Sequence, residues 1–525
     1  MAGTGRPGRV QQIAYDATPL TASQPDVDAR IGWLLAMSRL HHHNADFADG
    51  RTFIEALADA GLNVSRSQIS RWESGEAAVS YEATAAYERA LGLLPGRLSS
   101  LTGYIRSAIP GIKTRVLRPR LDPASRAFAL RLDELVDLAE DGGAKAADWQ
   151  ELGWHLSAAP LVHLRAGTWQ NLADEIVSII PRSINVAYRQ YSTAAMNMAT
   201  VPRAQDFLVR AISTYLSVPD VQVVTNPVGL LDQLPTREAA DLVLDMIEDP
   251  PRPSAYRLAV WVATSKVLRG DFTADERTRL GMIVLRIWRA NPTAAARDLA
   301  ELIAALPEGL RASLTQAASR SGQHRAGYVI EHGEGLVASE ARTTAWRLAE
   351  GARRRAPGDP EYGEDRMLVR LLREVLFHRD SERRHLAALV IASSPFRGPV
   401  AEELIGLLGE AGTPEWIRGR TATTIRYLAD DEHRLRLLHW LQDPDAEVAA
   451  PVAQTMGHLS HAPISDQALR AALGPQWSVV ERARMYALGM SGSAGLRAIS
   501  RSATAPAWQK AAARWWIEIG PAVRD

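Results

Sequence analysis

Short amphipathic segments separated by polar turns occupy most of the chain. In the segment from Arg51 to Gly61, one helix face is apolar and is expected to point inward; it carries Phe53, Ile54, Leu57 and Ala58. A second helical segment runs from Asp28 to Leu40. Strand-like alternation is scarce, and its best candidate is the short segment Val221-Gln222-Val223-Val224. The pattern therefore predicts an all-α fold.

A quasi-repeat emerges in the last third of the chain. Val448, Val452 and Met456 form one apolar stripe, and such a stripe buries one helix face against neighbouring helices. Similar helical segments recur at intervals of about 30 residues, beginning at Arg383, Arg418, Glu447, Val480 and Gln509. These segments resemble HEAT-type repeats, in which helix pairs stack into a solenoid. An irregular helical domain is the alternative.

Composition divides the chain into five parts. The first 25 residues are rich in Gly, Thr, Ser and Pro, which predicts a mobile tail. Three prolines between Pro110 and Pro123 disfavour a helix, so this stretch is interpreted as a basic linker. The expected parts are a tail over 1–25, a helix-turn-helix domain over 26–109, the linker over 110–124, a helical domain over 125–380 and HEAT-like repeats over 381–525.

A short helix with a polar start and an apolar back is predicted after Val64. Ser65 is a good N-cap, and Ile69 and Trp72 lie three residues apart on one face. The polar side chains between Arg66 and Arg71 face outward or sideways. Arginine, glutamine and serine side chains can all bond to the edges of bases. A helix of this kind is suited to reading the major groove of DNA.

The twelve residues VSRSQISRWESG, Val64 to Gly75, resemble the helix-turn-helix of the XRE family, the phage Cro and CI repressor-like regulators. The likeness extends over about residues 26–106. It implies a recognition helix over Ser65–Glu73, with Ser65 at its start and base contacts from Arg66, Ser67, Gln68 and Arg71, and from Ser70 as an additional candidate. It also implies phosphate contacts from Arg51 and Thr52 at a helix N-terminus. The alternative is a plain helical bundle in which these residues form an exposed helix start.

The predicted linker supplies two further candidates for DNA binding. Lys113 and Arg115 could follow the DNA backbone or enter an adjacent minor groove. A solvated linker is the competing interpretation. With 60 basic and 60 acidic residues in the whole chain, a nucleic-acid site must be a local patch.

Composition also excludes several classes of chemistry. The absence of cysteine excludes disulfides, thiolate metal sites and cysteine nucleophiles. The three consecutive histidines from His41 to His43 are interpreted as a polar loop, since neighbouring loop side chains point in different directions. We identify no catalytic constellation and no cofactor motif, and expect the chain not to be an enzyme. No apolar span or secretory signal is visible, so we expect a cytoplasmic protein that does not bind a membrane.

These features together predict a sequence-specific transcription regulator that binds double-stranded DNA. A single short recognition helix reads few base pairs, so we expect a homodimer on a pseudo-palindromic operator. The helical body would support dimerisation and sense a peptide, a small molecule or a protein partner. The alternative is a helical-repeat scaffold or defence-type interaction protein whose helix-turn-helix head is only autoregulatory.

Overall fold

The computed structural model describes residues 13–109, 122–250 and 253–524, apart from residue 23, residues 160–161 and short gaps between 293 and 361. Within these residues the regular elements are α-helices and short 3-10 helices, and no β-strand forms, so the predicted all-α class is confirmed. An isolated bridge joins Ser183 and Val523. Among the described residues, no helix is long and apolar enough to cross a membrane.

The best candidate for a strand, Val221–Val224, does not form one. The segment is irregular and lies between α10 (Pro202–Ser217) and α11 (Thr225–Leu230). Its valines are buried, and the Arg482 guanidinium donates to the carbonyl oxygens of Val221 and Gln222. No second strand pairs with the segment, so a distant arginine satisfies backbone groups that a sheet would otherwise satisfy.

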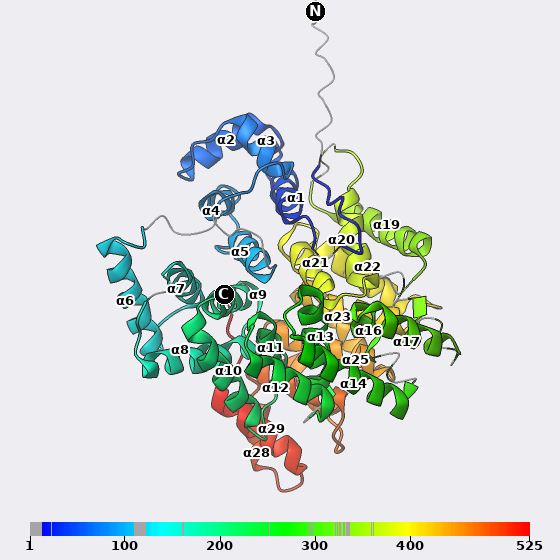
Figure 1. The fold of residues 1–525 in the computed structure, drawn as a ribbon. Coiled ribbons are helices and arrows are strands. Elements are labelled where there is room, and N and C mark those ends of the chain that lie inside the picture. Colours follow the sequence, from blue (N-terminus) through cyan, green and yellow to red (C-terminus); the bar gives the residue numbers. More distant parts are fainter. Residues whose placement is uncertain are drawn as a thin grey trace, which may run out of the picture.

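The N-terminal head, residues 26–109, holds five α-helices and one 3-10 helix (Figure 1). Helix α1 is apolar on nearly every side and almost entirely buried, because it packs on α3 within the head and on α21 of the body. Helix α5 likewise packs on α4 and on the body helices α9 and α21. The head comprises α1 (Val27–Leu40), η1 (Ala45–Ala48), α2 (Gly50–Asp59), α3 (Arg66–Glu73), α4 (Tyr81–Ala90) and α5 (Ser99–Ala108).

The middle of the chain forms the first part of the body. Helix α7 packs on α9, and Trp149, Leu152 and Trp169 are buried there, as expected for core aromatics and aliphatics. The described elements are α6 (Arg126–Glu140), α7 (Ala146–Ala158), α8 (Ala166–Ile179), η3 (Ile180–Arg182), α9 (Asn185–Ala199), α10, α11, η4 (Leu231–Gln233), α12 (Arg237–Glu248), α13 (Pro253–Arg269), α14 (Ala274–Ala290), α16 (Ala300–Ala305) and α17 (Glu308–Arg320).

The last third of the chain packs serially. Helices α21, α23, α25, α27 and α29 contain the five segments of the quasi-repeat, and each contacts the next one along the chain. The elements are α19 (Ala338–Arg355), α20 (Arg366–Phe377), α21 (Ser381–Ser393), α22 (Arg397–Gly409), α23 (Glu415–Leu428), η5 (Asp431–His433), α24 (Arg434–Leu438), η6 (His439–Gln442), α25 (Ala446–His458), α26 (Pro463–Ala472), α27 (Val479–Met490), α28 (Gly495–Arg501) and α29 (Ala507–Ile519).

Residues 13–22, which precede α1, lie against the body rather than extending from it. Composition predicts a mobile tail over residues 1–25; residues 1–12 and 23 lie outside the described residues, whereas Ala14 and Asp16 are buried. The carbonyl oxygen of Leu20 contacts the His378 ring at 2.7 Å, and that of Ala22 accepts from Arg383 at 3.1 Å. Polar composition did not reveal these contacts, because body residues from more than 350 positions away bind the segment's backbone.

Candidate nucleic-acid interface

The predicted recognition helix forms as α3, beginning one residue after its cap. The Ser65 hydroxyl accepts a hydrogen bond from the backbone N–H of Gln68 at 3.2 Å, so Ser65 is the N-cap as expected. The helix ends at Glu73, and Gly75 follows in the left-handed region with φ +77°. Ser80 caps α4 in the same way, through the N–H of Ala83. The two caps and the intervening turn set the length and direction of α3.

The outward face of α3 carries the polar side chains that the sequence predicts to contact bases. Arg66, Ser67, Ser70 and Arg71 are exposed, and Gln68 is half-buried. Arg66 and Ser70 are four residues apart, as are Ser67 and Arg71, so they form two adjacent rows along one side of the helix. Guanidinium, hydroxyl and amide groups are thus available together to a partner outside the protein.

The inward face of α3 is in close contact with α1. Ile69 and Trp72 are buried, as predicted. A side-chain carbon added at Gly32 of α1 would lie 2.6 Å from the Trp72 carbonyl oxygen, and one added at Gly75 would lie 2.7 Å from Ala29 Cα. Two glycines therefore let the backbones of α1 and of the end of α3 approach more closely than any other residue would allow.

A buried ion pair fixes the C-terminal end of α3. Arg39 of α1 makes a bidentate pair with Glu73, at 2.7 and 2.6 Å. The hydroxyl of Tyr87 on α4 donates to the same carboxylate at 3.3 Å. Burial first, and then the charge of Glu73, raise the pKa of Tyr87 well above its ordinary value, so its hydroxyl keeps its proton. Three helices are thereby joined behind the exposed face.

The predicted phosphate contacts lie at the start of α2, beside α3. Arg51 is exposed and Thr52 is half-buried. The side chain of Arg66 covers Gly50, since a carbon added there would meet its Nε at 3.4 Å. The Asp49 carboxylate caps this helix and accepts from the Arg51 N–H at 3.2 Å. A phosphate would therefore meet the side chains of Arg51 and Thr52 rather than that backbone group.

For two predicted contact residues the structure gives no information, and for one predicted loop it differs from the expectation. Lys113 and Arg115 lie outside the described residues. The interpretation of His41 to His43 as a polar loop is wrong for His41, which is buried and contacts the Pro357 carbonyl and the Tyr362 hydroxyl at 2.8 Å each. Burial lowers the pKa of this histidine, which therefore helps to attach the head to the body as a neutral ring.

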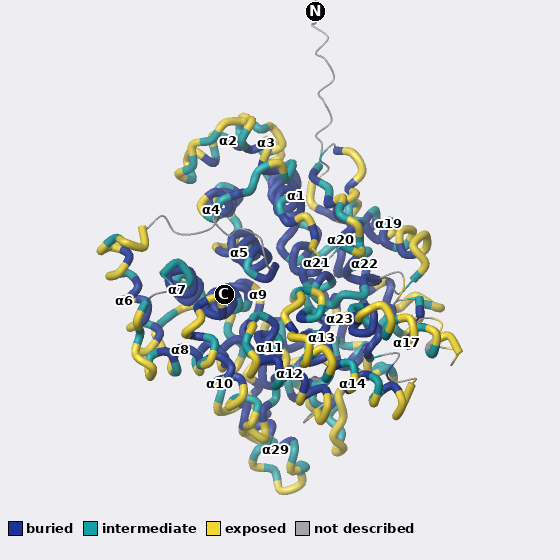
Figure 2. The backbone as a smooth tube through the Cα atoms, in the orientation of Figure 1, coloured by how far each residue is buried: buried dark blue, intermediate teal, exposed yellow. Residues whose placement is uncertain are grey.

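The exposed rows of α3 are remote from the body. In Figure 1, α2 and α3 form the outer end of the head, and α1 and α5 lie between them and the body. Figure 2 shows the same division in burial, with α1 buried and many exposed positions along α2 and α3. The body thus leaves the predicted reading face accessible.

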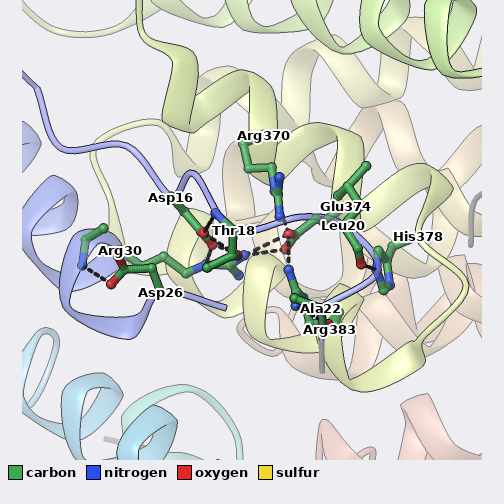
Figure 3. A network of polar contacts seen from close by, with 11 residues as sticks. Asp16, Thr18, Leu20, Ala22, Asp26, Arg30, Arg370, Glu374, His378 and Arg383 are labelled. Atoms are coloured by element: carbon green, nitrogen blue, oxygen red, sulfur yellow. Dashed lines mark hydrogen bonds and ion pairs between the residues drawn. The ribbon is translucent and has the colours of Figure 1, made fainter. Parts of the chain in front are cut away.

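The attachment of the head to the body is charged and buried. Arg30 of α1 donates to Asp16 at 2.8 Å and to Glu374 of α20 at 2.7 Å (Figure 3). Arg370 and Arg383 also donate to Glu374, at 2.8 and 2.9 Å. Although burial raises the pKa of Glu374, the three guanidiniums lower it far more, and the carboxyl stays ionised. We refer to these five residues as the junction network.

Sequence reasoning missed both ion-pair systems behind the interface. Glu73 is part of the recognised motif, but nothing local identifies Arg39, 34 positions earlier, as its partner. Arg30 and Glu374 are 344 positions apart. The available signal is Arg30, directly before the apolar stretch from Ile31 to Leu35, since an arginine on a buried helix face requires a buried partner.

Comparisons with known proteins give no relative for this chain: no family model and no curated protein sequence matches it. What the outer end of the head does must therefore be inferred from its geometry.

Proposed function

We propose that this protein is a sequence-specific DNA-binding transcription regulator and that α3 is its recognition helix. The observation that carries the proposal is the exposed polar face of α3, held from behind by Ile69, Trp72 and the Arg39–Glu73 pair. A major-groove reader needs such a helix, with adaptable donors outside and a rigid support inside. The resemblance of Val64 to Gly75 to XRE-family regulators supports the same function.

The roles of the exposed residues follow from their chemistry. Arg66 and Arg71 can each bond bidentately to guanine, Gln68 to adenine, and Ser67 or Ser70 to either groove edge. Arg51 and Thr52 at the start of α2, with Ser65 at the start of α3, would contact phosphates and fix the register. Together they present a contiguous surface across two helices.

Two copies of the chain on a pseudo-palindromic operator are part of the proposal. Helix α3 has eight residues, Arg66–Glu73, and can reach only a few base pairs. A second head one helical turn of DNA away would double the contacts and supply the spacing. The body would hold the two heads in register.

The serial packing of α21, α23, α25, α27 and α29 supports the interpretation of the last third as HEAT-like repeats. Solenoids of this kind present long surfaces to partners. We therefore assign the body the roles of dimerisation and of sensing a ligand or a protein.

Genome-wide mapping of sites bound in the native host, followed by gel shifts with the full chain, tests the proposal. A specific regulator should prefer its operator over random DNA by roughly 10³-fold or more. Weak binding that salt abolishes equally for all sequences would contradict it and would favour a helical-repeat scaffold or defence-type interaction protein whose head is only autoregulatory.

Single substitutions assign the binding to α3. Gln68→Ala and Arg71→Ala should each weaken operator binding by about 1–3 kcal/mol with an unchanged thermal transition. The matched controls are Gln467→Ala and Arg514→Ala, which remove exposed side chains of the same types from α26 and α29. Equal affinity of both α3 variants and both controls would remove the assignment. Light scattering of the protein–operator complex, with one half-site scrambled as a control, tests the dimer.

A further inference from the structure

A large cavity lies between the body and the end of the head that includes α5, and no residue of α3 lines it. Its volume is about 1470 Å³, larger than the roughly 300–1,000 Å³ of an ordinary small-molecule site. Its wall includes residues of α5, α9, α11, α13, α16, α21, α23, α25 and α27. The cavity could therefore hold a ligand larger than a single amino acid or sugar.

Positive charge predominates in the wall. Among the described residues, eight arginines but only four carboxylates line the cavity. Asp232 is paired with Arg269 at 2.8 Å, and Glu301 with Arg384 at 2.8 Å. Burial, together with the nearby Asp232 and Asp380, raises the pKa of Glu382 to about 8, so this carboxyl is largely neutral at pH 7. The four carboxylates thus offset only part of the charge of the eight arginines.

Two of these arginines are held by neutral groups. Arg97 donates to the carbonyl oxygens of Ser393 and Ser394, both at 3.2 Å. Arg426 donates to the Gln454 side-chain oxygen at 2.8 Å and to the Tyr427 hydroxyl at 3.1 Å. These bonds orient the guanidiniums without neutralising them. An anion entering the cavity would supply the missing charge.

Like charges already interact in this wall. Burial lowers the pKa of Arg97, and the neighbouring charge of Arg397 lowers it further. Burial also lowers the pKa of His385 to about 4, with a further decrease from Arg426. The contributions of Arg397 and Arg426 to these decreases indicate a positive potential at Arg97 and His385, which favours a bound anion there.

Aromatic side chains also line the cavity, and two of them, Tyr427 and His385, neighbour Arg426. The ring of Tyr104 on α5 lies 5.9 Å from that of Tyr188 and 5.7 Å from that of His385, and His385 lies 5.4 Å from Tyr427. Tyr486 on α27 continues the row and bonds to His458 at 2.8 Å. Such rings provide flat apolar surfaces with hydroxyl groups at their edges, which suit a planar ring system.

We infer that this cavity binds a polyanionic aromatic ligand of the nucleotide class, with its phosphates on Arg97 and Arg426 and its planar ring on the row from Tyr104 to Tyr486. The size of the cavity favours a nucleoside polyphosphate or a dinucleotide over a mononucleotide. Guanidiniums spread over several helices match charges spread along one ligand.

Isothermal titration calorimetry with the full chain, in the absence of DNA, tests this assignment. ATP and GTP are the probes, and adenosine, guanosine and inorganic tripolyphosphate are the controls for the ring and for the charge. We expect ATP or GTP to bind at least roughly tenfold more tightly than either part alone, a difference of about 1.4 kcal/mol. Equal binding of tripolyphosphate and the nucleotides, or no heat with either nucleotide at millimolar concentration, would overturn the assignment.

Substitutions place the ligand within the cavity. Arg426→Gln removes the charge and keeps an amide that can bond to Gln454, and it should weaken nucleotide binding roughly tenfold. Arg514→Gln on α29, outside the cavity, should bind as the natural protein does. Hydrogen exchange with and without nucleotide is the second measurement, because it needs no variant. Protection should appear in α5, α21 and α23, and protection confined to other helices would contradict the proposed site.

The cavity is also connected to the head. Tyr104 belongs to α5, and its hydroxyl contacts His385 of α21 at 3.0 Å. A ligand on this wall would therefore change operator affinity, a consequence that rests on the proposed DNA-binding function. Calorimetry without DNA tests nucleotide binding alone, and gel shifts without nucleotide test DNA binding alone. Failure of either proposal can therefore be told from failure of the other. If nucleotide binds but leaves operator affinity unchanged, only the proposed effect of the ligand on DNA binding is contradicted.

Discussion

The two sides of the head differ in how their polar residues are used. On the outer side, Arg66, Ser67 and Arg71 are exposed on α3. On the inner side, Arg30 is buried and bonds to both Asp16 and Glu374. The same residue type therefore presents donors to solvent on one side and holds the head to the body on the other.

This difference shows how a reading head can be rigidly mounted. An exposed arginine contributes little to stability and remains available to a partner. A buried one must be fully paired, and it then ties together elements that are distant in sequence. Since α1 and α5 are both packed on the body, the orientation of α3 depends on the body as well as on the head.

Removing the centre of the junction network should have the largest effect. Glu374→Ala leaves Arg370 and Arg383 without the carboxylate and reduces the pairing of Arg30, and it should destabilise the protein by about 3–5 kcal/mol. Urea unfolding followed by circular dichroism measures this. Glu134→Ala, which removes an exposed partner of Arg131, is the control and should change stability by less than about 0.5 kcal/mol. Equal losses in the two variants would contradict the conclusion that buried ion pairs contribute far more to stability than exposed ones.

The close approach of α1 and α3 should be the next most sensitive feature. Gly32→Ala places a carbon 2.6 Å from the Trp72 carbonyl oxygen, so α3 must move, at a loss of about 1–3 kcal/mol. Operator binding should weaken with it. In Gly406→Ala, within α22, the new carbon has no neighbour within 4 Å, and stability should rise by roughly 0.5–1 kcal/mol. Thermal denaturation of both variants measures the two effects. If Gly32→Ala were as stable as Gly406→Ala, the close approach of α1 and α3 at Gly32 would be contradicted.

The pH dependence of stability should report on the inner side. Burial, opposed by the Glu374 charge, lowers the pKa of His378 from 6.5 to about 4. Between these values the unfolded chain binds a proton that the folded protein does not. Stability is therefore complete above pH 6.5 and falls toward pH 4, by about 1.4 kcal/mol per pH unit from this residue.

His378→Gln isolates this contribution from that of the other histidines. The slope of unfolding free energy against pH between 5 and 6.5 should be shallower in the variant than in the natural protein by about 1.4 kcal/mol per unit. Parallel slopes would show that His378 does not remain neutral at the junction.

The outer side should give the smallest change in stability. Arg66→Ala should alter the free energy of unfolding by less than about 0.5 kcal/mol, because its side chain is exposed. Its effect on operator affinity should be larger than its effect on unfolding. If the variant unfolds more easily but binds the operator normally, Arg66 supports the fold and does not contact DNA.

Local signals predicted the outer side of the head well. Ser65 as a cap and Ile69 and Trp72 as the buried face are confirmed, because each depends on spacing within one helix. In α2, Phe53 and Leu57 are buried as expected, but Ala58 is exposed. An alanine near a helix end has too little apolar surface to determine whether its side chain faces the core or the solvent.

Features that join distant segments were not predictable. The cavity is the clearest example, because its arginines and tyrosines come from segments spread between the turn before α5 and α27. Each of them resembles an ordinary surface or core residue when viewed alone. The placement of residues 13–22 was hidden for the same reason, since Asp16 is buried and bonds to Arg30, which also bonds to Glu374 of the body.

The sequence by itself determined the helical class, the start of α3 and the side of α3 that faces outward, because periodicity and capping act within a few residues. Only the tertiary structure decided how α1 and α5 are mounted, which charges are buried and where the cavity lies. Those properties depend on contacts such as the one between Arg30 and Glu374, 344 positions apart, and no local pattern encodes which distant partner a buried charge will meet.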